Sequence, residues 1–179
     1  SNAVLLRGIR GLLRGRGFFG HKPRRLTCNT NAPNPDLNGV QEDGNNNLTI
    51  NVLPGAAIDT RLPGGNGLDA IKTGDGNNII TVNDGNIAAQ GSAMETEIGN
   101  DQVTITDSEI TNENFNTIDL GGGSNVLNIT RSIVTNASGR VLSLSGGMAA
   151  GGNIVTIIDS EIKTLGTSGR AINVGNEND

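Results

Sequence analysis

The sequence predicts an all-β fold: a right-handed, single-stranded parallel β-helix (a solenoid) of about five coils over residues 46–179. Two observations predict it. The chain contains imperfect repeats of 23 to 30 residues, and its composition has 27 Gly, three Phe and neither Tyr nor Trp. Globular domains normally fill their centres with aromatic side chains, whereas stacked coils bury slim aliphatic ones. The repeats and the composition therefore agree.

Each repeat opens with a strand in which two apolar residues lie two apart, followed by a polar turn and a third apolar residue. This alternation is typical of a strand with one buried face. The equivalent triplets, whose first members are spaced by 30, 23, 24 and 28 residues, are Ile50/Val52/Ile58, Ile80/Val82/Ile87, Val103/Ile105/Ile110, Leu127/Ile129/Val134 and Val155/Ile157/Ile162. We expect each triplet to stack on the equivalent triplet of the next coil.

A second strand follows in every repeat and ends at Gly or at a polar residue. Its expected inward pairs are Ile71/Thr73, Thr96/Ile98, Ile118/Leu120, Leu142/Leu144 and Ile172/Val174. Helical solenoids are excluded, because no repeat carries a 3.6-residue apolar stripe and Gly and Asn are poor helix formers. The segments that vary in length, residues 61–66 and 146–152, are expected to project as surface loops.

The chain divides into segments of opposite charge. Residues 1–3, Ser-Asn-Ala, resemble the remnant of a purification tag and are set aside. Residues 1–25 carry seven Lys or Arg and no acid, and residues 26–179 carry six Lys or Arg and all 18 acids, so the net charges are +7 and −12. We predict a basic N-terminal arm or cap over residues 4–27 and an Asn/Pro-rich connector over residues 28–45. An acidic body repels nucleic acid, so no nucleic-acid partner is expected.

In the basic arm, Leu5, Ile9 and Leu12 recur at helical spacing among arginines. This pattern fits a capping helix over the open first coil, a segment that contacts an anionic membrane, or part of an export leader. We favour the cap, because it would cover unpaired strand groups. His21 has no partner at ligand or triad spacing, and a single cysteine, Cys28, allows no internal disulfide.

The units Gly74-Asp-Gly-Asn-Asn-Ile-Ile-Thr-Val-Asn-Asp-Gly-Asn-Ile87 and Gly121-Gly-Gly-Ser-Asn-Val-Leu-Asn-Ile-Thr130, led in by Cys28–Asp36, resemble the passenger domains of bacterial autotransporters. The resemblance is one of repeat style and covers residues 28–179. It implies a pertactin-like, adhesin-type β-helix, secreted or held at the cell surface by an outer-membrane barrel in the full-length protein. The sequence stops directly after a repeat. We therefore expect a fragment, or self-association through the open ends of the β-helix.

β-Helices also include polysaccharide lyases and hydrolases, which gather carboxylates on one face beside calcium or a basic side chain. Asp84, Asp107 and Asp159 fall at equivalent turn positions, with Arg131 in the same column. Such a column fits a catalytic row or a solvated turn. We favour the turn, because the chain lacks the Trp and Tyr platforms that commonly stack on sugars. No catalytic residue is assigned.

Two further resemblances concern ligands. Residues 74–78 and 121–125 resemble calcium-binding nonapeptide repeats, but the period is longer and Asn replaces Asp, which favours turn chemistry. We assign no metal ligand and expect no cofactor. The expected outward pairs of the first strand resemble the threonine ladder of ice-binding solenoids, although Asn and Ile interrupt it and Thr is common on exposed strands. These pairs are Thr49/Asn51, Thr81/Asn83, Thr104/Thr106, Asn128/Thr130 and Thr156/Ile158.

The sequence thus predicts a non-catalytic cell-surface or secreted scaffold, an adhesin-type passenger. Its expected partner is a protein or glycan on a host or neighbouring cell, and the residues that bind it are not identified by the sequence. The main alternative is a carbohydrate-active enzyme of the β-helix class. Such an enzyme would bring two or more acids within about 5 to 10 Å of each other on one face.

Overall fold

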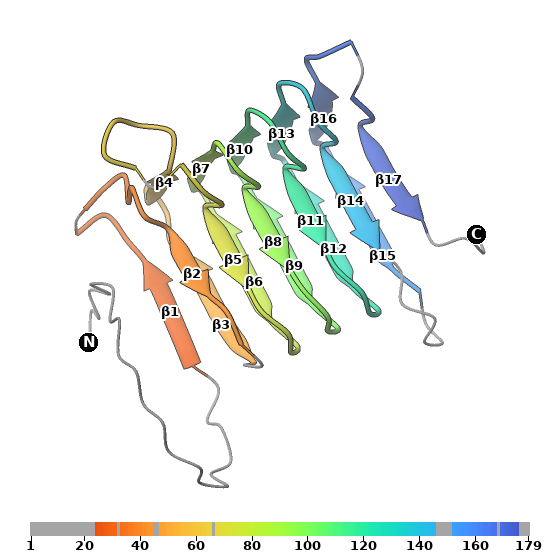
Figure 1. The fold of residues 1–179 in the computed structure, drawn as a ribbon, viewed down its shortest axis with the longest axis horizontal. Helices are drawn as coiled ribbons and strands as arrows, with labels where there is room; N and C mark the ends of the chain where they lie inside the picture. Colours follow the sequence, from red (N-terminus) through yellow and green to blue (C-terminus); the bar gives the residue numbers. More distant parts are fainter. Residues whose placement is uncertain are drawn as a thin grey trace, which may run out of the picture.

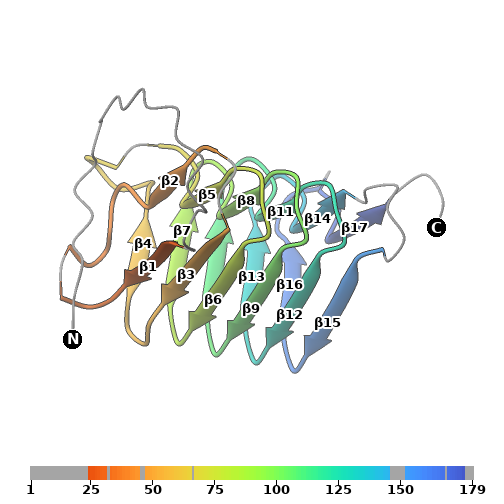
Figure 2. The same cartoon turned by 90° about the horizontal axis from the view of Figure 1, so that it is seen from below.

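A computed structural model describes residues 24–31, 33–44, 47–65, 67–145, 152–167 and 169–175 of the chain. Over these residues the protein is a parallel β-helix with three sheets, and no helix is present among them (Figures 1 and 2). Nothing in this part of the chain is a helix long and apolar enough to cross a membrane. The predicted all-β solenoid is confirmed. The expected N-terminal cap and His21 lie outside the described residues.

Each complete coil contributes one strand to each sheet. The first sheet contains, in spatial order, β1 (Arg24–Cys28), β3 (Leu48–Val52), β6 (Ile79–Asn83), β9 (Gln102–Thr106), β12 (Val126–Thr130) and β15 (Ile154–Ile158). The second contains β4 (Ala57–Asp59), β7 (Asn86–Ala89), β10 (Glu109–Asn112), β13 (Ile133–Asn136) and β16 (Glu161–Thr164). The third contains β2 (Val40–Glu42), β5 (Ile71–Thr73), β8 (Met94–Thr96), β11 (Ile118–Leu120), β14 (Leu142–Ser145) and β17 (Ile172–Gly175).

The core is a set of aliphatic columns that run along the axis of the β-helix. Ile80, Val103 and Leu127 are fully buried and lie beside one another on neighbouring strands, as the repeats predict. The third residue of each predicted triplet also points inward, but it lies in a strand of its own. The polar turn between the first strand and this residue is short, and the chain after it pairs again with the neighbouring coils in a second sheet. Each coil therefore has three sides.

One predicted pair of the third sheet is wrong. The structure places Met94 and Thr96 inward, whereas Ile98 is 69% exposed. The prediction assumed that the strand runs directly into Gly99, as the next one runs into Gly121. The position equivalent to Gly121 is instead Glu97, whose carbonyl lies against Gly121. Met94 fills the place between Ile71 and Ile118, because the flexible thioether side chain adapts to an aliphatic column.

The repeat region begins earlier than residue 46. The predicted connector 28–45 is wrong in its boundaries, because β1 and β2 are outer strands of the first and third sheets and Asp36 forms a parallel bridge with Ile58 beside the second. The described residues 24–31 and 33–44 therefore form an additional first coil. Its pattern is hard to see in the sequence because Cys28 stands at the position of Val52 and Val40 is the one apolar residue of its strand.

A ladder of Asn and Asp side chains, called the amide ladder below, lies where the third sheet turns into the first. Its described members, which precede successive strands, are Asn78, Asp101, Asn125 and Asn153. In each of them the side-chain Oδ1 accepts a hydrogen bond from a backbone N–H of the preceding coil. The donors are, in the same order, Leu48, Asn78, Asp101 and Asn125, at distances of 3.2, 2.8, 3.0 and 3.0 Å. These bonds satisfy backbone donors at a corner where the sheets pair no strands, which is a requirement for any buried N–H group.

Asp101 is the one carboxyl among these four residues. Asn78 and Asn125 donate from Nδ2 to the carbonyl oxygen four residues earlier, at 3.3 and 2.9 Å. In Asp101 the corresponding atom is Oδ2, which is buried and has no hydrogen-bond partner among the described residues. Burial raises the pKa of Asp101, because the charged carboxylate loses its hydration. A proton on Oδ2 would supply the donor that asparagine provides at this position.

Asp101→Asn is expected to stabilise the protein at pH 8. A pKa raised in the folded state means that the stability contributed by protonated Asp101 is complete below its unfolded-state pKa. That contribution is lost as the pH rises through the folded-state pKa. The substitution should raise the free energy of unfolding at pH 8 by about 1–2 kcal/mol and flatten its pH dependence, measured by urea unfolding between pH 4 and 9.

Asn125→Asp is the matched control for this change, because it places a second carboxyl in the same ladder. It should lower the unfolding midpoint increasingly as the pH rises. A lower stability of Asp101→Asn at pH 8, or a pH profile equal to that of the parent chain, would contradict the assignment.

Two substitutions in one aliphatic column test how burial varies along the axis. Ile105 is fully buried between Val82 and Ile129, whereas Ile157, two coils further along, is half-buried. Ile105→Ala should lower the free energy of unfolding by about 2–5 kcal/mol, through lost transfer energy and a cavity. Ile157→Ala should cost clearly less. Equal losses in thermal or urea unfolding would show that the last described coil is as tightly packed as the middle.

Candidate functional site

The predicted column of charged residues exists. Asp84, Asp107, Arg131 and Asp159 occupy the same turn position between the first and second sheets, with φ of 47, 50, 46 and 50°. This left-handed conformation is tolerated by Asp but is uncommon for Arg. The backbone N–H of Asp107 donates to the carbonyl of Thr130 at 3.1 Å, and that of Arg131 to Ile158 at 2.9 Å. The turns are therefore joined coil to coil by their backbone.

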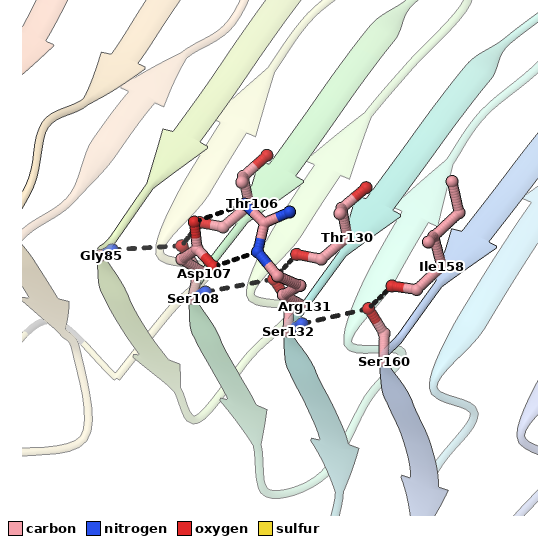
Figure 3. Close-up of polar contacts among 9 residues, drawn as sticks. All are labelled: Gly85, Thr106, Asp107, Ser108, Thr130, Arg131, Ser132, Ile158 and Ser160. Carbon is pink, nitrogen blue, oxygen red and sulfur yellow. Dashed lines mark hydrogen bonds and ion pairs between the residues drawn. The ribbon is translucent and has the colours of Figure 1, made fainter.

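A ladder of serines, which the sequence analysis did not single out, follows the column directly (Figure 3). Ser108, Ser132 and Ser160 each donate from Oγ to the carbonyl two residues earlier, at 2.6, 2.7 and 2.7 Å. Each Oγ also accepts the backbone N–H of the coil before it, at 3.1, 3.1 and 3.0 Å. Hydroxyls engaged in this way are structural groups and not free nucleophiles. The signal in the sequence was the serine after Asp or Arg at each of these turns.

Asp107 and Arg131 form a two-pronged ion pair across neighbouring coils. Nε and Nη2 of Arg131 each donate to one carboxylate oxygen of Asp107 at 2.7 Å. The side chains are 55% and 45% exposed for Arg131 and Asp107, respectively. Hydrogen bonding to Arg131 lowers the pKa of Asp107, because it stabilises the carboxylate. Asp84 and Asp159 lie in the same column, but among the described residues neither joins this ion pair.

An open groove of about 380 Å³ lies beside the column. Its walls include Asp84, Asp107, Glu109 and Arg131, so it collects three acids and one base. A general acid needs a carboxyl whose pKa is raised toward neutrality. The pKa of Asp107 is shifted in the opposite direction, and both of its oxygens are held by Arg131. This geometry favours the interpretation of the column as a solvated, ion-paired turn.

Carboxyls with raised pKa values lie elsewhere in the molecule. Burial raises the pKa of Asp69 and of Asp101, and neither residue was singled out in the sequence. Asp69 accepts the backbone N–H of Ser92 at 2.5 Å, and Asp101 belongs to the amide ladder. Neither lines the groove beside the charged column. Both carboxyls therefore act as hydrogen-bond acceptors for backbone N–H groups at the corners where they lie.

The segments that resemble calcium-binding repeats use their side chains to close turns. Nδ2 of Asn78 donates to the carbonyl oxygens of Gly74 and Gly76, and Oδ1 of Asp75 accepts the N–H of Ile98 at 3.1 Å. Within the described ranges, no three His, Cys, Asp or Glu side chains come together in a way that could hold a metal ion. These contacts support the turn chemistry inferred from the sequence.

The outward columns of the first sheet differ in register from the predicted threonine ladder. Thr49 lies beside Ile79, and Asn51 lies beside Thr81. The central outward column reads Thr27, Asn51, Thr81, Thr104, Asn128 and Thr156. The outward residues of β3, β6, β9, β12 and β15 include no charged side chain. The face formed by these five strands is therefore uncharged, β1 adds Arg25 beside Thr49, and asparagine interrupts the threonine column.

Cys28 is a packing residue. Its side chain contacts the aliphatic core, and burial, with a smaller contribution from Asp36, raises the pKa of its thiol to about 11. A thiol with this pKa carries very little thiolate at neutral pH, and the thiolate is the reactive form. Cys28 is consequently not a candidate nucleophile.

Arg131→Gln should return the pKa of Asp107 toward its ordinary value of 3.8, because the guanidinium is the main cause of the shift. Carboxyl ¹³C NMR between pH 2 and 7 measures this change. Asp59, whose pKa is lowered separately by Arg61, is the internal control and should not move. The thermal midpoint should change little at any pH, because ion pairs this exposed contribute little stability. An unchanged Asp107 titration would contradict the pairing.

Comparisons with known proteins do not place the chain in a family. No family model, no curated protein and no solved structure matches it.

Proposed function

We propose that this chain is a non-catalytic scaffold whose rigid β-helix presents binding residues at its corners and loops. The observation that carries the proposal is the state of the charged column Asp84, Asp107, Arg131 and Asp159. Asp107 and Arg131 neutralise each other, and the hydroxyls of Ser108 and Ser132 are engaged with the backbone. A regular core that holds its polar corner groups in fixed hydrogen bonds is suited to displaying surface side chains in fixed positions.

The biological setting that fits this scaffold best is outside the cell, as an adhesin-type passenger of a bacterial autotransporter that is secreted or held at the outer surface. The repeat style of residues 28–179 supports this proposal, as does the acidic character of residues 26–179, which favours solubility and disfavours nucleic acid. Its partner is then a protein or glycan on a host or neighbouring cell. Long solenoids commonly use loops that differ in length between coils for such contacts.

A carbohydrate-active enzyme remains the second candidate, because Asp84, Asp107 and Glu109 line one open groove together with Arg131. Paired carboxyls across a sugar bond are what glycoside chemistry requires. The lowered pKa of Asp107 and the exposure of the column make this candidate the weaker one. The two functions differ in one readout, the release of new reducing ends.

The purified full chain should bind at least one glycan or extracellular-matrix protein saturably on an array, without releasing reducing sugar from that glycan. Neither the parent chain nor its Asp107→Ala and Asp159→Ala variants should release reducing sugar above background. Reducing-sugar release that Asp107→Ala abolishes would replace the scaffold proposal with the enzyme. Failure to bind any member of the array or matrix panel would also count against the adhesin assignment.

A further inference from the structure

A second groove, of about 440 Å³, lies at a different corner of the β-helix, where the second sheet turns into the third. Its walls come from three consecutive coils, between β10 and β11, between β13 and β14, and between β16 and β17. The side chains that matter most are those of Phe115, Arg140 and Arg170. This groove is separate from the charged column, which lies between the first and second sheets.

Arg140 and Arg170 occupy equivalent positions in neighbouring coils. The N–H groups of Thr117 and Val141 donate to the carbonyls of Arg140 and Arg170 at 2.9 and 3.1 Å, which fixes the two arginines one above the other. Successive strands are about 4.8 Å apart in such a stack. The backbone positions that carry these two exposed arginine side chains are therefore close together, on a body with a large excess of acid.

Neither of these arginines has an acidic partner among the described residues. In contrast, five other Lys and Arg side chains do, namely Arg24, Arg61, Lys72, Arg131 and Lys163. Two stacked like charges without a counter-ion repel each other, and an anion placed between them relieves that repulsion. Guanidinium groups bind carboxylates most strongly through paired N–H donors. The arginine pair thus favours a ligand with a carboxylate.

The groove also has an aromatic wall and a floor without side chains. The side chain of Phe115 is 66% exposed, although its carbonyl is held by Nδ2 of Asn136. In the next two coils its position is taken by Gly139 and Gly169. A Cβ at Gly139 would lie 2.2 Å from the carbonyl oxygen of Phe115, and one at Gly169 would lie 2.3 Å from that of Gly139. The two glycines therefore let the backbones of successive coils approach closely, and they add no side chain to the groove.

Polar groups suited to hydroxyls complete the walls. Asn114 and Asn116 both use Nδ2 within the protein, as donors to the Gln90 carbonyl at 3.3 Å and to Asp119 at 2.7 Å. Among the described residues no hydrogen bond engages their Oδ1 atoms, so these atoms can accept hydrogen bonds from a ligand. The groove thus combines an exposed aromatic ring, two arginines from neighbouring coils and amide oxygens that can accept hydrogen bonds from ligand hydroxyls. Its volume is typical of small-ligand sites.

We propose that this groove binds a sugar ring that carries a carboxylate, a hexuronate unit of an acidic polysaccharide or glycan. Arg140 and Arg170 hold the carboxylate, and the apolar face of the sugar ring stacks on Phe115. Asn114 and Asn116 accept hydrogen bonds from the ring hydroxyls. The proposal rests on the binding function argued above and names the chemical class of its ligand.

The test is isothermal titration of the full chain with short oligomers of galacturonate and of glucuronate, and with the same oligomers after carboxyl reduction. Saturable binding of at least one acidic oligomer is expected, weakened by added NaCl, with no binding of its neutral counterpart. Arg140→Gln and Arg170→Gln should each weaken binding by about tenfold or more, as loss of a charge-assisted hydrogen bond does. Phe115→Ala should weaken it as well.

Arg131→Gln is the matched control, because it removes an exposed arginine that is already paired with an acid, and it should bind like the parent chain. Circular dichroism of each variant checks that the fold is retained. Equal affinity for acidic and neutral oligomers, or unchanged affinity in both groove variants, would overturn the inference. If no acidic oligomer binds while the array shows saturable binding to other ligands, the uronate site fails and the scaffold function stands.

Discussion

The structure depends on one constraint, the parallel register that places each residue beside its equivalent in the next coil. Backbone hydrogen bonds between strands set this register on the three sides, and at the corners side chains take over the same task. The amide ladder of Asn78, Asp101 and Asn125 and the serine ladder of Ser108, Ser132 and Ser160 pass hydrogen bonds from coil to coil where no strand pairing exists. Core columns and corner ladders are thus two results of one register.

Most of the core could be predicted from the sequence, because each aliphatic side chain is repeated in several coils. The errors arose where a coil departs from the common pattern. Met94 lies at a position that other coils give to Val, Ile or Leu, and the first coil has Cys28 where the next has Val52. The sequence of one strand does not reveal such a substitution in a core column, because the register with the neighbouring strand decides which of its side chains point inward.

The candidate sites were predictable to different degrees. The column of Asp84, Asp107, Arg131 and Asp159 was visible in the sequence, because its members follow the same strand at the same distance. The groove lined by Phe115, Arg140 and Arg170 was not, since these residues become neighbours only when three successive coils are stacked. The decisive difference between the two sites is pairing. Arg131 has an acid within 2.7 Å, whereas the two groove arginines have none among the described residues, and pairing cannot be deduced from residue types.

The walls of the arginine groove come from three different coils. The repeating unit of the fold is therefore a single coil, whereas ligand recognition requires three coils together. A solenoid tolerates the gain or loss of a whole repeat, because each coil contacts only its neighbours and the new junction has the same register. Recombination that removed the coil containing Gly139 and Arg140 would leave a continuous core and intact ladders. It would also bring Phe115 directly against the coil of Gly169 and Arg170, with half of the positive charge gone. In such a lineage, ligand preference can change in one genetic event at almost no cost to folding.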